Sequence, residues 1–184
     1  MTRKTRRQVL LRLCAGLALA AGLVAACQLW VVEGFRVEGC CMEPGIRSGE
    51  RVLVTKLDYL VRPPRRGDLV VFHYPRDPGK LYLKRVIALP GERVELRGQR
   101  VYVNGRPLGD RAARAHRACF YGPVTVPPGR LFVLGDNRDN SNDSRFWGTL
   151  PERDVVGRVR WRYWPPGRAG GLPTTGVVAA GKVH

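Results

Sequence analysis

Lys84 is the side chain whose sequence neighbours best suit acid–base chemistry. It lies in an apolar segment between Leu83 and Val86, and Arg85 follows it directly. Successive side chains of a strand alternate between its two faces, so Lys84 and Arg85 should point in opposite directions and one of them inward. A lysine desolvated by apolar neighbours loses its proton more readily and can act as a general base near neutral pH. The alternative interpretation is a lysine whose ammonium group reaches the surface along its extended stem.

Cys40 and Cys41 offer a nucleophile. They lie in the segment 39–44, which reads Gly-Cys-Cys-Met-Glu-Pro. A thiol is a stronger nucleophile than a hydroxyl group and ionises at a lower pH. Together with Cys119 they make three thiols beyond the apolar N-terminal segment, so in an oxidising compartment at least one stays unpaired within the chain. Because a disulfide between adjacent residues is strained, Cys40 and Cys119 are the preferred pair if one forms.

A run of polar residues from Gly135 to Arg145 directly follows the apolar segment 130–134. Asp, Asn and Ser at this density form turns through hydrogen bonds from side chain to backbone. The run leads into Phe146-Trp147-Gly148, which has the character of a buried segment, and a plain surface loop does not require such density there. The pattern therefore predicts a polar network that supports a site.

Short apolar or alternating segments, separated by turns, indicate that mostly strands position these residues. The chain of 184 residues has 22 glycines and 14 prolines, which is typical of a domain with many turns. Asn104-Gly105 is a strong signal for a type I′ hairpin. The pattern predicts a mostly β fold, an antiparallel β-sheet or barrel. Strands are expected at 51–56, 69–72, 81–89, 93–96, 101–103, 130–134 and 155–164, with a turn at 63–68 and a basic loop at 109–123.

The N-terminal region combines a basic segment, 1–12, with an uncharged apolar segment, 13–32. At about 1.5 Å per residue, a helix over the second segment spans the hydrocarbon core of a bilayer. The basic flank predicts a cytoplasmic N-terminus, a single-pass anchor and a folded domain, 33–164, on the other side of the membrane. A flexible tail is expected at 165–184. A cleavable signal peptide, or a lipoprotein signal ending at Cys27, is the alternative.

The formal net charge of +17 concerns partners and solubility rather than fold. The arginines are scattered through strand-like segments, and the sequence has no zinc-finger or RNP pattern, so no nucleic-acid partner is expected. Beside a membrane segment, anionic lipids are the favoured partner. A proteome rich in arginine is the alternative explanation of the charge. The three histidines are dispersed and no Cys/His spacing suggests zinc, so neither a metal nor a cofactor is expected.

Three segments together resemble the bacterial type I signal peptidases, the Ser/Lys-dyad proteases that remove signal peptides from exported proteins. The segments are 39–44, 82–92 and 135–148, in the family's order behind a membrane anchor, and the similarity covers residues 33–164. The resemblance implies an antiparallel β domain of the signal peptidase I type, anchored in the bacterial inner membrane by one transmembrane helix. It also implies that signal peptides of secreted pre-proteins are the partners.

The resemblance further implies roles for individual residues. Lys84 falls on the family's general base, and Ser141 on the serine that orients this lysine. Asp143 and Arg145 fall on an ion pair that braces the site. Gly135 and Asp136 belong to a supporting turn. The positions near pockets for small, Ala-x-Ala-like side chains before the cut are Phe35, Val37, Met42, Tyr82 and Leu83.

The match departs from the family's pattern at the nucleophile. The family's serine directly precedes a methionine, and here Cys41 precedes Met42. Gly39 replaces a serine that assists the oxyanion hole in many members, and Gly45-Ile46 replaces the usual Thr-Leu. The sequence thus predicts a membrane-bound signal-peptide endopeptidase with a Cys41/Lys84 dyad, in which Lys84 mainly protonates the leaving amine. The alternatives are a non-catalytic relative and a specialised conjugation or pilus maturation peptidase.

Overall fold

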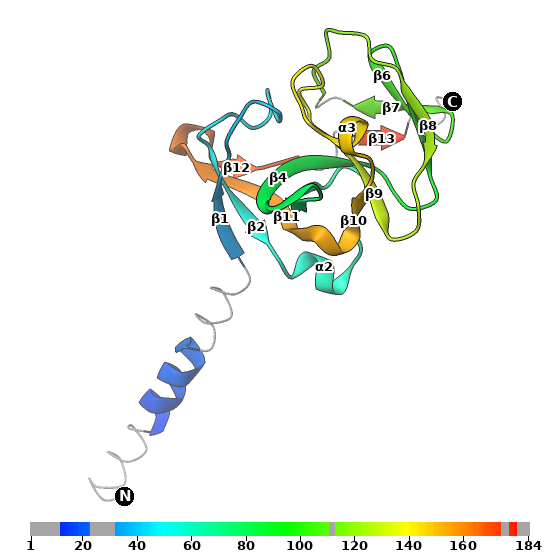
Figure 1. Ribbon diagram of the computed structural model, residues 1–184. Coiled ribbons are helices and arrows are strands. Elements are labelled where there is room, and N and C mark those ends of the chain that lie inside the picture. Colours follow the sequence, from blue (N-terminus) through cyan, green and yellow to red (C-terminus); the bar gives the residue numbers. More distant parts are fainter. Residues whose placement is uncertain (1–11, 23–31, 111–112, 174–176, 180–184) are drawn as a thin grey trace, which may run out of the picture.

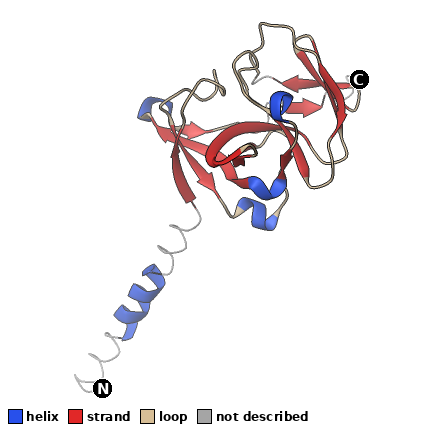
Figure 2. Ribbon diagram, in the orientation of Figure 1, coloured by secondary structure: helices blue, strands red, loops and turns tan. Residues whose placement is uncertain are grey.

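The structure is a computed structural model, and it describes residues 12–22, 32–110, 113–173 and 177–179. Residues 12–22 are helical, and the rest of the described chain is mostly strand (Figures 1 and 2). None of the described helices is both long and apolar enough to cross a membrane. The anchor predicted at 13–32 includes residues 23–31, which lie outside the described part of the chain.

The larger of two sheets has eight strands, all paired antiparallel (Figure 1). Within the described residues it is open, because its path starts at β1 and ends at β10 without returning. The eighth strand, the short β12, lies off this path and pairs with β11. In path order the strands are β1 (Val32–Arg36), β2 (Arg51–Thr55), β11 (Val155–Trp164), β3 (Leu69–Tyr74), β4 (Asp77–Ala88), β9 (Arg130–Leu134) and β10 (Leu150–Pro151), with β12 at Gly170–Gly171.

The second sheet has five strands and is also antiparallel. β6 and β7 are joined by Asn104 and Gly105, whose φ angles of 52° and 75° are those that a type I′ hairpin requires. The predicted hairpin is therefore confirmed. In path order the strands are β13 (Val177–Ala179), β7 (Arg106–Asp110), β6 (Arg100–Val103), β5 (Arg93–Arg97) and β8 (Tyr121–Thr125).

The core is divided because β3 is buried on both faces. Leu69 and Val71 pack in one cluster with Met42, and Val70 and Phe72 pack in another on the opposite face. An apolar run without polar alternation suits a strand covered on both sides. A third cluster lies under the second sheet. The first of these clusters lies directly beneath the segment that carries Cys41.

The mostly β, antiparallel fold is confirmed, but the loop predicted at 109–123 is only partly a loop. β7 extends to Asp110 and β8 begins at Tyr121. Pro123 and Gly122 weaken the strand signal of β8, since neither residue favours a strand interior. The remaining helical elements are single turns: α2 (Asp58–Val61), α3 (Ser144–Trp147), η1 (Glu152–Asp154) and η2 (Pro166–Arg168).

Part of the region for which a flexible tail was predicted packs on the domain. β12 hydrogen-bonds with β11, and Leu172 is buried in the same cluster as Met42. The Leu172 N–H donates to the Arg160 carbonyl at 2.8 Å. Within residues 165–173, the chain therefore contributes to the core beneath the candidate site.

Candidate active site

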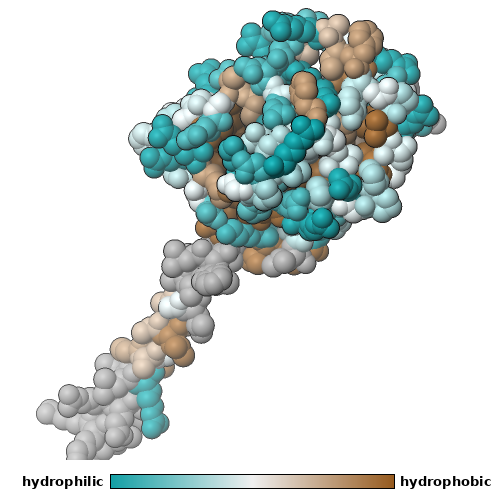
Figure 3. Space-filling model, in the orientation of Figure 1, coloured by the Kyte–Doolittle hydropathy of each residue, from teal (hydrophilic) through white to brown (hydrophobic). Residues whose placement is uncertain are grey.

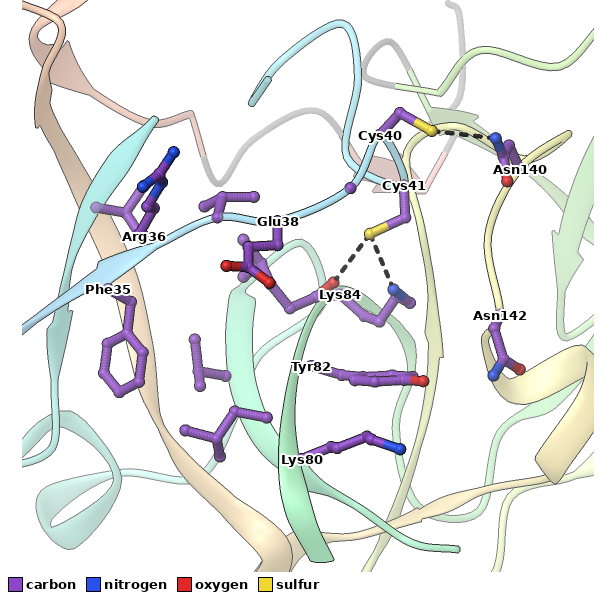
Figure 4. Close-up of a pocket in the computed structure, with 16 residues that line it drawn as sticks. Phe35, Arg36, Glu38, Cys40, Cys41, Lys80, Tyr82, Lys84, Asn140 and Asn142 are labelled. Carbon is purple, nitrogen blue, oxygen red and sulfur yellow. Dashed lines mark hydrogen bonds between the residues drawn. The ribbon is translucent and has the colours of Figure 1, made fainter. Parts of the chain in front are cut away.

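A groove of about 630 Å³ lies between β4 and the wall formed by the end of β1 and the segment that follows it. Phe35 to Cys41 form one wall, and Lys80 to Lys84 form the other (Figure 4). Asn140 and Asn142 from the polar run 135–145 line one end. The predicted pocket residues Phe35, Val37, Tyr82 and Leu83 all line this groove, and Val52 and Val71 add apolar surface.

Cys41 and Lys84 meet in this groove. Lys84 Nζ donates to Cys41 Sγ at 3.1 Å, and Figure 4 shows the two side chains pointing toward each other. Lys84 is only 3% exposed, and its Nζ lies 5.2 Å from the centre of the Tyr82 ring. Cys41 Sγ also lies 3.9 Å from the Leu83 carbonyl oxygen. A nucleophile and a proton-carrying amine at this distance can exchange a proton directly.

Lys84 and Arg85 point to opposite faces of β4, as the strand alternation predicts, yet both are buried at 3% exposure. The buried guanidinium of Arg85 forms a bidentate ion pair with Asp136, and both N–O distances are 2.7 Å. A further Arg85 N–H donates to the Gly67 carbonyl at 2.9 Å. Burial raises the pKa of Asp136, and the hydrogen bonds from Arg85 oppose that rise. This pair anchors the start of the polar run 135–145 beneath β4.

Asp143 organises the other end of the polar run. Its carboxylate accepts from the Gly135 N–H at 3.1 Å and from the Arg145 guanidinium at 2.8 and 2.9 Å. It also caps α3, accepting from the Arg145 backbone N–H. Burial is the largest effect and works against the charge of Arg145, but the hydrogen bonds and the charge of Asp143, together with Cys119, outweigh it and raise the pKa of Arg145. Gly135, Asp143 and Arg145 thus form one connected hydrogen-bonded network.

Ser141 lies at the centre of this support. Its Oγ is buried and has no hydrogen-bond partner among the described residues, so no hydrogen bond joins it to Lys84 there. It packs closely against Gly135: a Cβ added at Gly135 would lie 2.2 Å from Ser141 Oγ and 2.6 Å from the Cys41 carbonyl oxygen. Only a residue without a side chain allows the polar run to approach Cys41 this closely.

Met42 is placed differently from the other predicted pocket residues. It is fully buried in the apolar cluster beneath the groove and is not among the residues that line it. The segment turns there, with the Ile46 N–H donating to the Met42 carbonyl at 2.9 Å. Met42 therefore anchors the Cys41 segment to the core from below.

The thiols of Cys40, Cys41 and Cys119 are unpaired in the structure, so the candidate Cys40–Cys119 disulfide is not formed. Cys40 Sγ accepts from Asn140 Nδ2 at 3.0 Å. Cys119 lines a separate, smaller hollow beside Arg145, whereas Cys40 lines the groove. The two thiols therefore lie in different parts of the surface.

Two asparagines that the sequence did not single out hold the Cys41 segment. Asn137 donates to the carbonyls of Cys40 and Cys41, and Asn140 donates to the Cys40 thiol. Both belong to the polar run in which a supporting network was predicted. The high density of Asn residues in the sequence indicated a network of this kind. It did not indicate which amide contacts which carbonyl, because those contacts join residues nearly one hundred positions apart.

Replacing Gly135 by alanine is expected to disrupt the site, because the new Cβ meets Ser141 Oγ and the Cys41 carbonyl. Overpacking of this kind costs about 1–3 kcal/mol. We expect a lower thermal unfolding temperature and a lower rate of any reaction that depends on the contact between Cys41 and Lys84. Gly170→Ala is the matched control, since nothing lies within 4 Å of a Cβ built there. Wild-type behaviour of Gly135→Ala in both measurements would contradict the packing described.

Fold and site together define a class: a mostly antiparallel β protein in which a thiol and a buried lysine amine are paired in a groove. A family model for signal peptidase, peptidase S26, matches residues 10–164. Signal peptidase I of Leptolyngbya laminosa is 38% identical over 163 residues, covering 85% of this chain and 80% of that protein. Probable signal peptidase I-1 of Synechocystis sp. is 37% identical over 171 residues, covering 89% and 87%. Signal peptidase I of Bacillus caldolyticus is 38% identical over 161 residues, covering 80% and 87%. The chain belongs to the signal peptidase, peptidase S26, family.

Proposed function

We propose that this chain is a membrane-bound endopeptidase that removes N-terminal signal peptides from exported pre-proteins, with Cys41 as nucleophile and Lys84 as proton carrier. Family membership supports the reaction. The assignment of Cys41 and Lys84 to these roles is based on the 3.1 Å contact between Lys84 Nζ and Cys41 Sγ. Among the described residues, Lys84 is the titratable side chain that hydrogen-bonds to this sulfur.

The groove suits an extended peptide. On one side, residues 81–85 of β4 pair with β3, but the pairing of β4 with β9 begins only at Arg85. The opposite backbone edge of residues 81–84 therefore has no strand partner in the described chain, and it faces the groove. A substrate segment can add there as a strand, placing alternate side chains toward Phe35, Val37 and Leu83. Small residues such as alanine fit pockets lined by these apolar side chains.

The proposed reaction has two steps, acylation of Cys41 and hydrolysis of the resulting thioester. Cys41 Sγ attacks the carbonyl carbon of the scissile bond, and its proton passes to Lys84. Lys84 protonates the departing amine as the C–N bond breaks, which leaves the signal peptide as a thioester on Cys41. Water, losing a proton to Lys84, then attacks the thioester, and the proton returns to the sulfur as the C–S bond breaks. No metal or cofactor takes part.

The support around the dyad fits the roles that the resemblance implied. We assign to Ser141, whose buried hydroxyl has no partner among the described residues, the orientation of Lys84. Asp143, Arg145, Asp136 and Gly135 hold the polar run against the Cys41 segment. Met42 shapes the pockets from below rather than by direct contact.

We further propose that residues 1–12 are cytoplasmic, that 13–32 anchor the chain in the inner membrane, and that the domain lies outside the cytoplasm. Trp161 and Trp164 are about half exposed, at 49% and 51%, and both belong to β11 of the larger sheet. Apolar side chains are visible at the base of the domain, near the N-terminal helix (Figure 3). Tryptophan favours the level of the lipid headgroups, and the net charge of +17 suits anionic ones.

Cleavage of a pre-protein by the detergent-solubilised full chain under reducing conditions tests the proposal. Wild type is expected to release the mature protein, and Cys41→Ala is expected to fall to the background rate because the nucleophile is lost. Cys119→Ala, which alters a thiol outside the groove, serves as the control and should keep the wild-type rate. A wild type that does not cleave, beside a Cys41→Ser variant that does, contradicts the proposal and identifies a non-catalytic relative. Cleavage of only one or a few pre-proteins identifies a specialised maturation peptidase instead.

A further inference from the structure

Asn137 holds both peptide groups that flank the Cα atom of Cys41. Its side-chain Nδ2 donates to the Cys40 carbonyl at 3.2 Å, and its backbone N–H donates to the Cys41 carbonyl at 3.0 Å. The Glu43 N–H donates to the same Cys40 carbonyl at 3.1 Å. Both peptide groups that set the conformation of Cys41 are therefore held by hydrogen bonds.

Asn137 is itself held firmly. It forms a parallel bridge with Arg114, whose N–H donates to the Asp136 carbonyl at 2.7 Å. The Arg138 N–H donates to the Arg114 carbonyl at 2.8 Å, and Arg138 Nε donates to the Gly135 carbonyl at 2.9 Å. A residue fixed on both sides can act as a rigid support for the segment that it contacts.

The direction of the Cys41 N–H follows from this arrangement. The peptide bond between Cys40 and Cys41 is trans, so its carbonyl and its N–H point in opposite directions. The carbonyl accepts from Asn137 and Glu43, and therefore the N–H points away from both of these donors, while Cys41 itself lines the groove. Within the described chain, this N–H donates to no backbone carbonyl.

We propose that Asn137 is a positioning residue, whose side-chain amide aims the Cys41 N–H at the oxyanion that forms when Cys41 attacks a peptide carbonyl. The inference rests on the proposed function. The negative oxygen of the tetrahedral intermediate needs a donor that is already oriented, since a preformed donor requires no reorganisation during the reaction. Gly39, two residues before Cys41, has no side-chain hydroxyl, and its own N–H donates to Ser48 Oγ at 3.2 Å. Gly39 therefore supplies no donor to the oxyanion, and its stabilisation depends on the orientation of the Cys41 N–H.

The test compares wild type with Asn137→Ala and Asn137→Asp, using three measurements. Both variants lose the side-chain donor but keep the backbone N–H that holds the Cys41 carbonyl. Loss of an oxyanion donor costs about 10²–10³ in kcat, and for a donor that is misaimed rather than lost we expect a fall of about 10- to 100-fold with KM unchanged. A peptide aldehyde ending in Ala-x-Ala, which forms a hemithioacetal on Cys41, should bind more weakly by a similar factor.

The third measurement separates positioning from general damage. Alkylation of Cys41 by iodoacetamide attacks a saturated carbon and forms no oxyanion, so its rate should equal that of wild type in both variants. Alkylation that slows in step with kcat would show a structural role and overturn the inference, as would unchanged kcat and aldehyde affinity. If wild type does not cleave pre-proteins, the proposed function fails. The aldehyde comparison still decides the role of Asn137, because equal affinities of variant and wild type exclude it.

Discussion

Lys84→Met is expected to lower the rate of pre-protein cleavage by about 10²–10⁴, the range that a positioned proton carrier contributes. Methionine fills a similar volume but carries no proton to the leaving amine. Lys84 Nζ is the group within hydrogen-bonding distance of Cys41 Sγ that can supply one. The measurement is kcat with a purified pre-protein, with the full chain in detergent under reducing conditions. Lys56→Met, which removes a lysine paired with Glu33 at the surface, is the matched control.

Two further results separate proton transfer from charge and from folding. Lys84→Arg keeps a cation but cannot release a proton, so it should be as inactive as Lys84→Met. Thermal unfolding of Lys84→Met should show no loss of stability, because exchanging a buried amine for an apolar side chain removes a desolvation cost. Activity in Lys84→Arg would mean that Lys84 acts only as a charge. Unfolding of Lys84→Met at a lower temperature would attribute its inactivity to the fold.

Asp136→Ala is expected to lower the free energy of unfolding by about 3–5 kcal/mol, the cost of leaving a buried charge without its partner. Arg85 and Asp136 have side chains only 3% and 1% exposed, and the variant strands the guanidinium between β4 and the polar run. Urea unfolding of the full chain in detergent, followed by tryptophan fluorescence, measures the change. Asp77→Ala is the matched control, because its pair with Lys80 is 46% and 66% exposed and its loss should not be measurable.

A double variant shows whether the penalty comes from the stranded charge. Arg85→Met combined with Asp136→Leu removes both charges and supplies apolar side chains. Replacing a buried pair in this way is often neutral or stabilising, so the double variant should be more stable than Asp136→Ala. A double variant as unstable as the single one would mean that losing the Arg85 hydrogen bonds to Gly67 and Pro173 costs as much as removing the unpaired charge gains.

Local pattern was sufficient for most strands and for the hairpin. The segments predicted at 69–72, 93–96, 101–103, 130–134 and 155–164 all coincide with strands, and Asn104-Gly105 forms the expected turn. Each of these signals comes from neighbouring residues: the alternation of side chains, or the ease with which Asn and Gly adopt positive φ. β8 was missed because its pairing with β5 depends on residues far away in the chain.

Alternation predicted the opposite faces of Lys84 and Arg85, but not that both would be buried. One face of β4 borders the groove, and the polar run covers the other through Asp136. β11 shows the same limit. Arg158 and Val159 are neighbours, yet both are buried, because Arg158 pairs with Asp68 at 2.9 Å and the register of β11 shifts on either side. Burial depends on what packs against each face, which a periodic pattern does not contain.

By itself the sequence determined the chemistry available in this protein: a thiol next to Met42, a lysine in an apolar strand, and a dense polar run. Those properties belong to residue types and to their immediate neighbours. The family resemblance already implied that Lys84 lies next to Cys41, but only the tertiary structure gave the 3.1 Å contact between them, placed Met42 in the core, and let Asn137 hold both peptide groups around Cys41. The physical reason is that the contacts of Lys84 with Cys41 and of Asn137 with Cys40 join residues more than forty positions apart, which strand pairing and the buried Arg85–Asp136 pair bring together.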